Sequence, residues 1–209
     1  MDYKKIKNII FDLGGVVIDI DFELTFKALA DLSTYSLEQT KKIMADLNIW
    51  DVYERGELSD VNFIKILKKE LKITANDDKV IAAWNALLLT IPIERVELIK
   101  DLNKKYNTYV LSNTSLYHIV GLNQILKDSS GDLSLHEVMN NKIYFSYEIN
   151  KRKPDLDIYE HIIKDAKIKA EETVFLDDNW DNIVAARETG INAIHVEVPQ
   201  TIMHYLKLA

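Results

Sequence analysis

Five short runs rich in β-branched and aromatic residues recur along the chain and constrain its fold more than any other feature. They are Lys7–Asp12, Asn107–Ser112, Lys142–Phe145, Thr173–Asp178 and Asn192–Val198. Segments with helical periodicity separate most of these runs, at Ile93–Tyr106, Asp155–Lys167 and Asn182–Thr189. Continuous apolar strands that alternate with helices indicate a parallel sheet buried on both faces. We therefore predict an α/β fold whose parallel sheet has helices on both faces.

A long insertion follows the first predicted strand. About 90 residues separate the first two strands, far more than one crossover helix needs. The inserted segment has helical patterns, with Ser36 and Ser59 as suitable N-caps, at Phe22–Leu32, Ser36–Leu47, Ser59–Leu71 and Asp77–Leu89. We predict a core formed by residues 1–18 and 91–209, with residues 19–90 as an inserted helical domain. The alternative is a helical decoration packed into a single common core.

The composition limits the kinds of binding partner and cellular compartment to be expected for this protein. The chain of 209 residues has a formal net charge of −7. This charge argues against nucleic acid or an anionic membrane as a partner, because both favour a basic face, and leaves small anions open. The absence of cysteine excludes disulfides and thiolate metal sites and is typical of a reducing compartment. No apolar run approaches the roughly 20 residues that span a bilayer, so we expect a cytoplasmic protein.

Polar residues follow the predicted strands at the points where those strands end. They are Asp12 after the first, Ser112 and Asn113 after the second, Lys153 beyond the third, and Asp177 and Asp178 after the fourth. Ligands of open parallel sheets bind at the carboxyl ends of the strands, so these side chains are expected to converge. Taken singly, each is also explained as a turn or cap residue.

Together, these residues describe a specific kind of site. Three carboxylates that approach one point repel each other unless a cation binds there, and oxygen ligands without His or Cys suit Mg²⁺. A cation with open positions, a lysine and a hydroxyl form a site for a phosphoryl group, whose oxygens need neutralisation. The six glycines contain no dinucleotide-binding or P-loop motif. The residues therefore favour phosphoryl transfer assisted by Mg²⁺.

Four ordered motifs carry a family resemblance: FDLGGV with Asp12, LSNT at 111–114, KP at 153–154 and FLDDN at 175–179. In this order the chain resembles the haloacid dehalogenase-like (HAD) hydrolase superfamily. The resemblance implies a Rossmann-like core, and the helical insertion is similar to the C1-type cap of subfamily I. The stretches YERGELSD, RKPD and FLDDNWDNI are most similar to the α-D-glucose-1-phosphatase-like subgroup, which contains bacterial phosphatases of hexose 1-phosphates.

The resemblance implies catalytic and substrate-binding roles for matching residues. Asp12 is expected to attack phosphorus and form an aspartyl-phosphate intermediate. Lys153 is expected to neutralise charge on Asp12 and on the phosphoryl group. Ser112 is expected to hold a phosphate oxygen with its hydroxyl, and Asn113 with its backbone N–H.

The resemblance also implies Mg²⁺ as the cofactor. Its expected ligands are the carboxylates of Asp12 and Asp178 and the Gly14 carbonyl oxygen, with Asp177 acting less directly. Asn182 occupies a position where relatives often have an outer-shell aspartate, so we expect it to support the site.

Gly14 is the departure from the family pattern. Phosphatases of the superfamily usually carry a second aspartate there, which protonates the leaving group and then activates water. General acid–base help is typically worth roughly 10²–10⁴-fold, so its loss weakens catalysis without abolishing it. Asp19 or Asp21, on the chain that leaves for the cap, is one replacement. The other is a substrate that needs less help, such as a glycosyl 1-phosphate, whose anomeric hydroxyl leaves readily.

The cap is expected to cover the site and to set specificity. Arg55 and Trp50, in and beside an interhelical turn, are candidates to contact a sugar. The alternative assigns Trp50 to the cap core and pairs Arg55 with a neighbouring acid. Trp84 is expected in the core and Trp180 at the surface.

The main hypothesis is a Mg²⁺-dependent phosphatase of a small phosphorylated metabolite, specifically a sugar phosphate such as a hexose 1-phosphate. A dehalogenase is a second hypothesis, but its chemistry needs no divalent cation, which counts against it. A catalytically weak HAD-like binding or phosphoacceptor protein is the third, because of Gly14. The sequence does not determine the oligomeric state.

Overall fold

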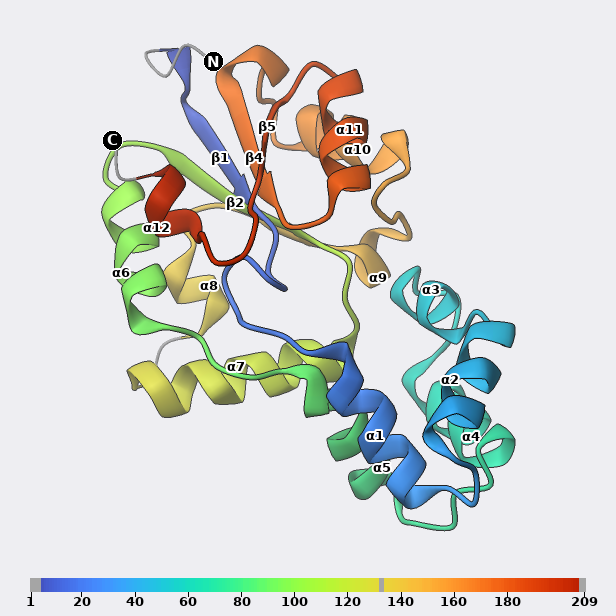
Figure 1. Cartoon of the computed structure of the whole chain (residues 1–209). Coiled ribbons are helices and arrows are strands. Elements are labelled where there is room, and N and C mark those ends of the chain that lie inside the picture. Colours follow the sequence, from blue (N-terminus) through green and yellow to red (C-terminus); the bar gives the residue numbers. More distant parts are fainter. Residues whose placement is uncertain (1–4, 132–133, 207–209) are drawn as a thin grey trace.

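The computed structural model describes residues 5–131 and 134–206 and contains a five-stranded sheet in the order β3-β2-β1-β4-β5 (Figure 1). The strands are β1 (Asn8–Phe11), β2 (Asn107–Ser112), β3 (Ile143–Phe145), β4 (Thr173–Asp177) and β5 (Asn192–His195). Every neighbouring pair is parallel. The strand order reverses at β1, which pairs with β2 on one side and β4 on the other. The α/β fold class predicted from the sequence is confirmed.

Side chains of the central strand β1 alternate between the two faces of the sheet. Ile9 and Phe11 enter one hydrophobic cluster and Ile10 enters the other. The first face is covered by α6 (Ile93–Leu102), α7 (Leu116–Ser130), α8 (Leu135–Val138) and α12 (Ile202–Tyr205), and the second by α10 (Leu156–Asp165) and α11 (Trp180–Glu188). Burial on both faces explains why the strands are continuously apolar. Among the described residues, no helix has both the length and the apolar character to cross a membrane.

The segment between β1 and β2 is helical. It contains α1 (Phe22–Leu32), α2 (Leu37–Asp46), α3 (Ile49–Glu54), α4 (Asp60–Glu70), α5 (Asp77–Trp84) and the 3₁₀ turn η2 (Asn85–Leu87). Ser36 and Ser59 cap α2 and α4 as predicted, accepting hydrogen bonds from the backbone N–H groups of Gln39 and Asn62. These helices share a hydrophobic cluster of their own, which includes the fully buried Trp84.

One cap helix, α3, was not predicted. It spans six residues and follows Asn48, which has a left-handed backbone conformation with φ of 47°. A helix of this length is too short to show a repeating apolar pattern. The predicted fourth helix also ends earlier than expected, because α5 tightens into η2 after Trp84.

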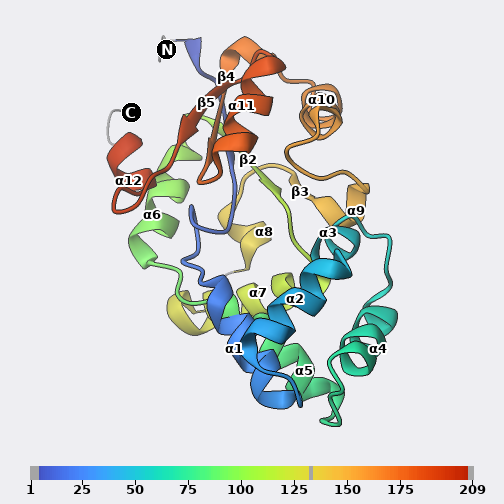
Figure 2. The same ribbon diagram turned by 45° about the vertical axis from the view of Figure 1, so that its right-hand side comes forward.

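The two chain segments that join the cap to the core lie side by side. The Asp19 N–H donates to the Thr90 carbonyl at 2.9 Å and the Leu89 N–H donates to the Asp19 carbonyl at 3.0 Å. An antiparallel bridge joins Ile20 to Leu88. We propose to place the cap boundaries here, at residues 19 and 90. Figures 1 and 2 show the cap beyond the carboxyl ends of β1 and β2.

Two short elements complete the core. The helix α9 (Ser146–Ile149) follows β3, and the 3₁₀ turn η3 (Ala170–Glu172) precedes β4. The loop after α9 carries Arg152 and Lys153, and α3 of the cap packs against α9. This contact brings the cap next to the loop that carries Lys153.

Candidate active site

A buried lysine lies between two carboxylates at the carboxyl edge of the sheet. Asp12 follows β1 and Asp177 ends β4, and the Nζ of Lys153 lies 2.9 Å from Asp12 Oδ1 and 2.6 Å from Asp177 Oδ2. The side chain of Lys153 is only 1% exposed. Burial opposes its charge, but the two carboxylates outweigh this effect and raise the pKa of Lys153. Burial raises the pKa of the Asp12 carboxyl to about 7, although Lys153 opposes the shift.

Asp177 is held by hydrogen bonds on both oxygens. Its Oδ1 accepts from the Asn179 N–H at 2.8 Å, and the Asn182 side-chain amide donates to both oxygens at 3.0 Å. Lys153 donates to Oδ2, and Asp177 is 0% exposed. Asp177 therefore orients Lys153. Both of its oxygens already accept hydrogen bonds, so its role at a metal ion would be indirect.

Three carboxylates could share a metal ion. Asp12, Asp177 and Asp178 each have an oxygen within 4.8 Å of the others. Partial desolvation and the neighbouring Asp177 raise the pKa of Asp178. One lysine balances only part of three negative charges. An all-carboxylate donor set with this excess charge fits a hard divalent cation such as Mg²⁺.

The loop after β1 passes close to this cluster. Gly15 has φ of +70°, and a Cβ at this position would lie 2.2 Å from Asp178 Oδ2. A side chain at position 15 would therefore be strained and would displace Asp178. The second glycine of the FDLGGV motif thus permits the close approach of Asp178 to the loop.

Ser112 and Asn113 lie where the end of β2 meets Lys153. Ser112 is buried and lines a small cavity of about 60 Å³ that also borders Gly14 and Asn113. The side-chain amide of Asn113 makes two hydrogen bonds to the backbone of Lys153, each 2.9 Å long. This second function of Asn113 was not predicted, because only its backbone N–H was assigned a role.

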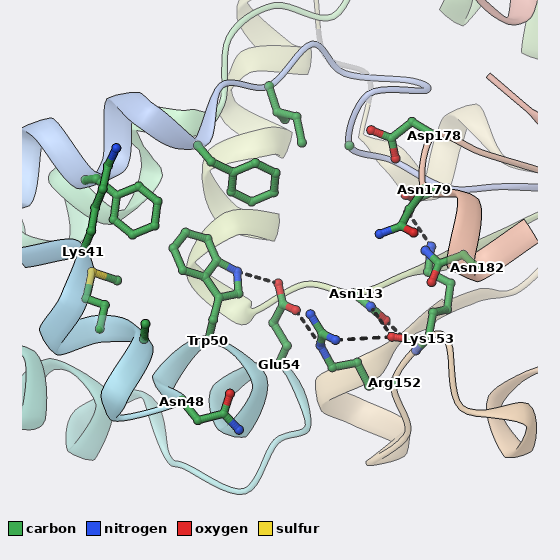
Figure 3. A pocket seen from close by; sticks show the side chains of 17 residues that line it. Lys41, Asn48, Trp50, Glu54, Asn113, Arg152, Lys153, Asp178, Asn179 and Asn182 are labelled. Carbon is green, nitrogen blue, oxygen red and sulfur yellow. Dashed lines mark hydrogen bonds and ion pairs between the residues drawn. The ribbon is translucent and has the colours of Figure 1, made fainter. Parts of the chain in front are cut away.

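A cavity of about 640 Å³ extends from the carboxylate cluster into the cap (Figure 3). Its core side is lined by Asp12, Gly14, Asn113, Arg152, Lys153, Asp178, Asn179 and Asn182, and its cap side by Ile20, Phe22, Phe26, Lys41, Met44, Ala45, Asn48, Trp50 and Glu54. One end is thus charged and the other largely apolar and aromatic. Trp50 lines this cavity and also packs on Trp84, with ring centroids 4.3 Å apart. Trp84 is buried and Trp180 is 53% exposed, as expected.

Arg55 requires a correction. It was a candidate to contact substrate, but it does not line the cavity. Its guanidinium pairs with Asp51 at 2.9 Å and with Asp155 of the core at 2.7 Å. This geometry corresponds to the alternative stated above, in which Arg55 pairs with neighbouring acids.

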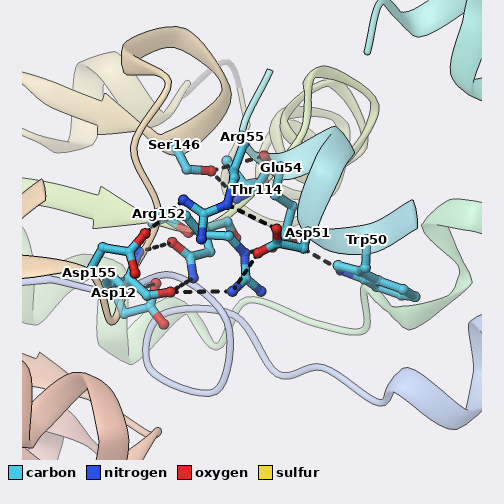
Figure 4. Close-up of polar contacts among 12 residues, drawn as sticks. Asp12, Trp50, Asp51, Glu54, Arg55, Thr114, Ser146, Arg152 and Asp155 are labelled. Atoms are coloured by element: carbon cyan, nitrogen blue, oxygen red, sulfur yellow. Dashed lines mark hydrogen bonds and ion pairs between the residues drawn. The ribbon is translucent and has the colours of Figure 1, made fainter. Parts of the chain in front are cut away.

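Arg152 and Glu54 line the cavity instead, and Figure 4 shows the polar contacts around them. Arg152 Nε donates to Glu54 Oε2 at 2.9 Å, and Trp50 Nε1 donates to Glu54 Oε1 at 3.0 Å. Arg152 also lies 3.5 Å from Asp51. Neither residue has a role predicted from the sequence, although Glu54 precedes Arg55 in YERGELSD and Arg152 precedes Lys153. Adjacency to these motif residues was the only signal available.

Asp19 and Asp21 are engaged away from the cavity. Asp19 Oδ1 pairs with Arg95 at 2.8 Å, and Asp21 accepts from the Glu23 N–H as the N-cap of α1. The space next to Gly14 is filled by Ile20, whose Cδ1 would lie 2.8 Å from a Cβ at position 14. Neither Asp19 nor Asp21 lines the cavity, so neither is placed to replace the aspartate that relatives carry at position 14.

A family model described as a haloacid dehalogenase-like hydrolase matches residues 6–190. The chain is 29% identical over 192 residues to the D-ribitol-5-phosphate phosphatase of Bacteroides thetaiotaomicron, covering 92% of each chain. It is 24% identical to the sesquiterpene phosphatase astK of Aspergillus oryzae, covering 91% of this chain and 89% of that one.

Among solved structures, the chain is similar to a HAD family enzyme of Bacteroides thetaiotaomicron in complex with magnesium and inorganic phosphate. The TM-score is 0.84 at 27% identity, and the match covers 96% of this chain and 98% of that chain.

Proposed function

Because the chain belongs to the haloacid dehalogenase-like hydrolase family, we propose that it is a Mg²⁺-dependent phosphatase of a small sugar phosphate or related phosphate monoester. The observation that carries the proposal is the placement of Lys153 between Asp12 and Asp177, beside Asp178. A nucleophilic carboxylate, a fixed cation and an acidic metal site are the groups that phosphoryl transfer needs.

Asp12 is the nucleophile in this proposal. Its free oxygen attacks phosphorus while the ester oxygen leaves, which gives an aspartyl-phosphate that water then hydrolyses. Lys153 holds the Asp12 carboxylate in place and attracts the phosphoryl oxygens. Ser112 and the Asn113 N–H bind the phosphoryl group from the end of β2.

The residues that would hold Mg²⁺ are Asp12, Asp178 and the Gly14 carbonyl, and the bound ion supplies charge neutralisation for the phosphoryl oxygens. Asp177 and Asn182 keep Lys153 and the adjacent loop in position through their mutual hydrogen bonds. The Mg²⁺ and phosphate complex of the structural relative and the phosphatase names of the curated relatives support this assignment.

Within this class of substrates, hexose 1-phosphates are the more specific candidates. The subgroup resemblance of YERGELSD and FLDDNWDNI supports them. The D-ribitol-5-phosphate phosphatase relative supports a phosphorylated polyol as the neighbouring possibility. The mixed wall of Phe22, Trp50 and Asn48 in the cavity suits a ring or chain that carries both C–H faces and hydroxyl groups.

A panel of hexose 1-phosphates, hexose 6-phosphates and polyol phosphates, assayed for released phosphate with and without Mg²⁺, tests the proposal. We expect Mg²⁺-dependent turnover of at least one sugar or polyol phosphate. If no phosphate is released from any compound of the panel or from p-nitrophenyl phosphate, the result favours the hypothesis of a catalytically weak HAD-like binding protein. Release of halide from a haloacid would favour the dehalogenase, against which the three-carboxylate cluster argues.

A further inference from the structure

We propose that Glu54, on cap helix α3, carries the proton that the leaving group needs and thereby replaces the acid missing at Gly14. The inference rests on the proposed phosphatase function. It adds a catalytic residue that comes from the cap, although the other acids of the site come from the strand ends of the core.

Glu54 borders both cavities of the site. It lines the large cavity together with Asp12, Lys153 and Asp178, and it also lines the small cavity that borders Gly14 and Ser112. Among the described residues around both cavities, Glu54 is the one carboxylic acid outside the Asp12 and Asp178 cluster. Figure 3 shows its side chain directed from the cap into the space between cap and core.

The other nearby acids are occupied elsewhere. Asp19 pairs with Arg95 and Asp21 caps α1, and neither lines a cavity of the site. Ile20 fills the volume next to Gly14 where the family acid would stand. A proton donor can therefore stand only on the opposite wall, which the cap supplies.

The surroundings of Glu54 suit a proton carrier. The residue is 5% exposed, and its two oxygens accept hydrogen bonds from Trp50 and Arg152, which fix the direction of the carboxyl group. Each carboxyl oxygen has a second lone pair that can hold or accept a proton. Burial raises the pKa of Glu54, and this effect exceeds the opposing effect of Arg152.

In the proposed reaction cycle, Glu54 gives up one proton and later regains one. In the first step the Asp12 oxygen forms a bond to phosphorus, the ester P–O bond breaks, and the leaving oxygen takes the proton from the Glu54 carboxyl group. In the second step water attacks phosphorus, the bond to Asp12 breaks, and Glu54 takes a proton from the attacking water. Inorganic phosphate and the alcohol are released, and Glu54 is again protonated.

An acid at Glu54 widens the range of esters that the site can cleave. If Gly14 left the site without an acid, only esters with good leaving groups would react well. With Glu54 as the donor, primary alkyl phosphates come within reach as well. The proton would also be delivered only when α3 lies against the core loop that carries Arg152, because this contact orients Glu54.

The test compares Glu54→Gln with Asp51→Asn as the matched control. Asp51 lies one helical turn from Glu54 on the same face, also pairs with Arg152, and does not line the cavity. For wild type and both variants, kcat/KM is measured with p-nitrophenyl phosphate, which has a good leaving group, and with phenyl phosphate, which has a poor one.

We expect Glu54→Gln to lower kcat/KM for phenyl phosphate by about 10²-fold or more, but for p-nitrophenyl phosphate by only a few-fold. The ratio of the two constants in Asp51→Asn should match that of wild type. Equal losses on both substrates, or no loss, would overturn the inference and leave Glu54 as a contact between cap and core. Absence of wild-type turnover of both aryl esters and of every sugar and polyol phosphate in the panel would instead reject the proposed phosphatase function, and this inference with it.

If Glu54→Gln does not fold, the wild-type enzyme still decides the question. Protonation of the leaving group predicts that wild-type kcat/KM differs little between the two esters. A wild-type preference of about 10²-fold or more for p-nitrophenyl phosphate would show that no acid assists departure and would overturn the inference.

Discussion

The side-chain amide of Asn113 clamps the backbone of Lys153: its Oδ1 accepts from the Lys153 N–H and its Nδ2 donates to the Lys153 carbonyl, both at 2.9 Å. The clamp fixes the chain from which the Lys153 ammonium reaches Asp12. The end of β2 thus positions a residue of the loop beyond β3. The effect of the Asn113 side chain on the position of Lys153 can be measured separately from its effect on folding stability.

Asn113→Ala should lower kcat by about 10²-fold, because a small displacement of a positioned group typically costs this much. It should also lower the free energy of unfolding by about 2 kcal/mol through loss of the two hydrogen bonds. Steady-state assays and urea unfolding check both values. Asn192→Ala is the control, since Asn192 also donates to two backbone carbonyls but lies at the start of β5. A similar kcat loss in the control would contradict a specific role of Asn113.

Asp12→Asn should abolish turnover and keep the fold. The two side chains are nearly isosteric, but a carboxamide cannot form the aspartyl-phosphate, so we expect a loss of at least about 10³-fold. Phosphate release and circular dichroism measure activity and fold. A folded variant with wild-type activity would mean that another group attacks phosphorus.

Removal of Mg²⁺ by chelation should stop phosphate release, and added Mg²⁺ should restore it. Asp178→Asn should weaken Mg²⁺ binding by at least about 10-fold, since loss of even an outer partner of a metal site typically costs roughly 10–100-fold. Isothermal titration calorimetry measures the affinity. Asp181→Asn, an exposed acid in the first turn of α11, should leave it unchanged. Full activity after exhaustive chelation would exclude the proposed metal dependence.

Folding stability should fall in acid partly because of His118. Its ring stacks on Trp84, with centroids 4.7 Å apart, and burial lowers its pKa from 6.5 to about 4. Below pH 6.5 the unfolded chain therefore binds a proton at His118. The folded protein does not bind this proton until the pH falls to about 4. Stability is lost across this window as pH falls, by about 3 kcal/mol from this group.

His118→Phe keeps an aromatic ring in contact with Trp84 and removes the titrating group. Urea unfolding at a series of pH values should show a loss between pH 6.5 and 4 that is about 3 kcal/mol smaller than in wild type. An identical pH dependence in both proteins would show that His118 is not the cause.

Asp19→Asn and Asp21→Asn should each leave kcat/KM for p-nitrophenyl phosphate within a few-fold of wild type. Asp19→Asn should cost up to about 1 kcal/mol of stability through loss of its pair with Arg95. Asp21→Asn should be almost neutral, because Asn is an equally good N-cap. A fall of about 10²-fold in a folded variant would identify that aspartate as the acid in place of Glu54.

The sequence by itself determined the parallel sheet, most of the helices and the set of residues that meet at the sheet edge. Strand and helix periods are local properties, and Ser36 and Ser59 cap their helices through neighbours three residues away. The convergence of Asp12, Lys153 and Asp178 followed from a topological rule, because parallel strands present their carboxyl ends at one edge. The roles of these residues in catalysis stay predictions.

Only the tertiary structure decided which side chains distant in the sequence meet. Glu54 of the cap meets Arg152 of the core across 98 residues of chain, and Asn113 meets Lys153 within the core across 40. Such contacts depend on how the packed elements lie against one another. The same packing turned Arg55 away from the cavity and brought Glu54 into its wall. No local pattern distinguishes two adjacent residues of one turn, because their orientation is set by the surfaces that bury them.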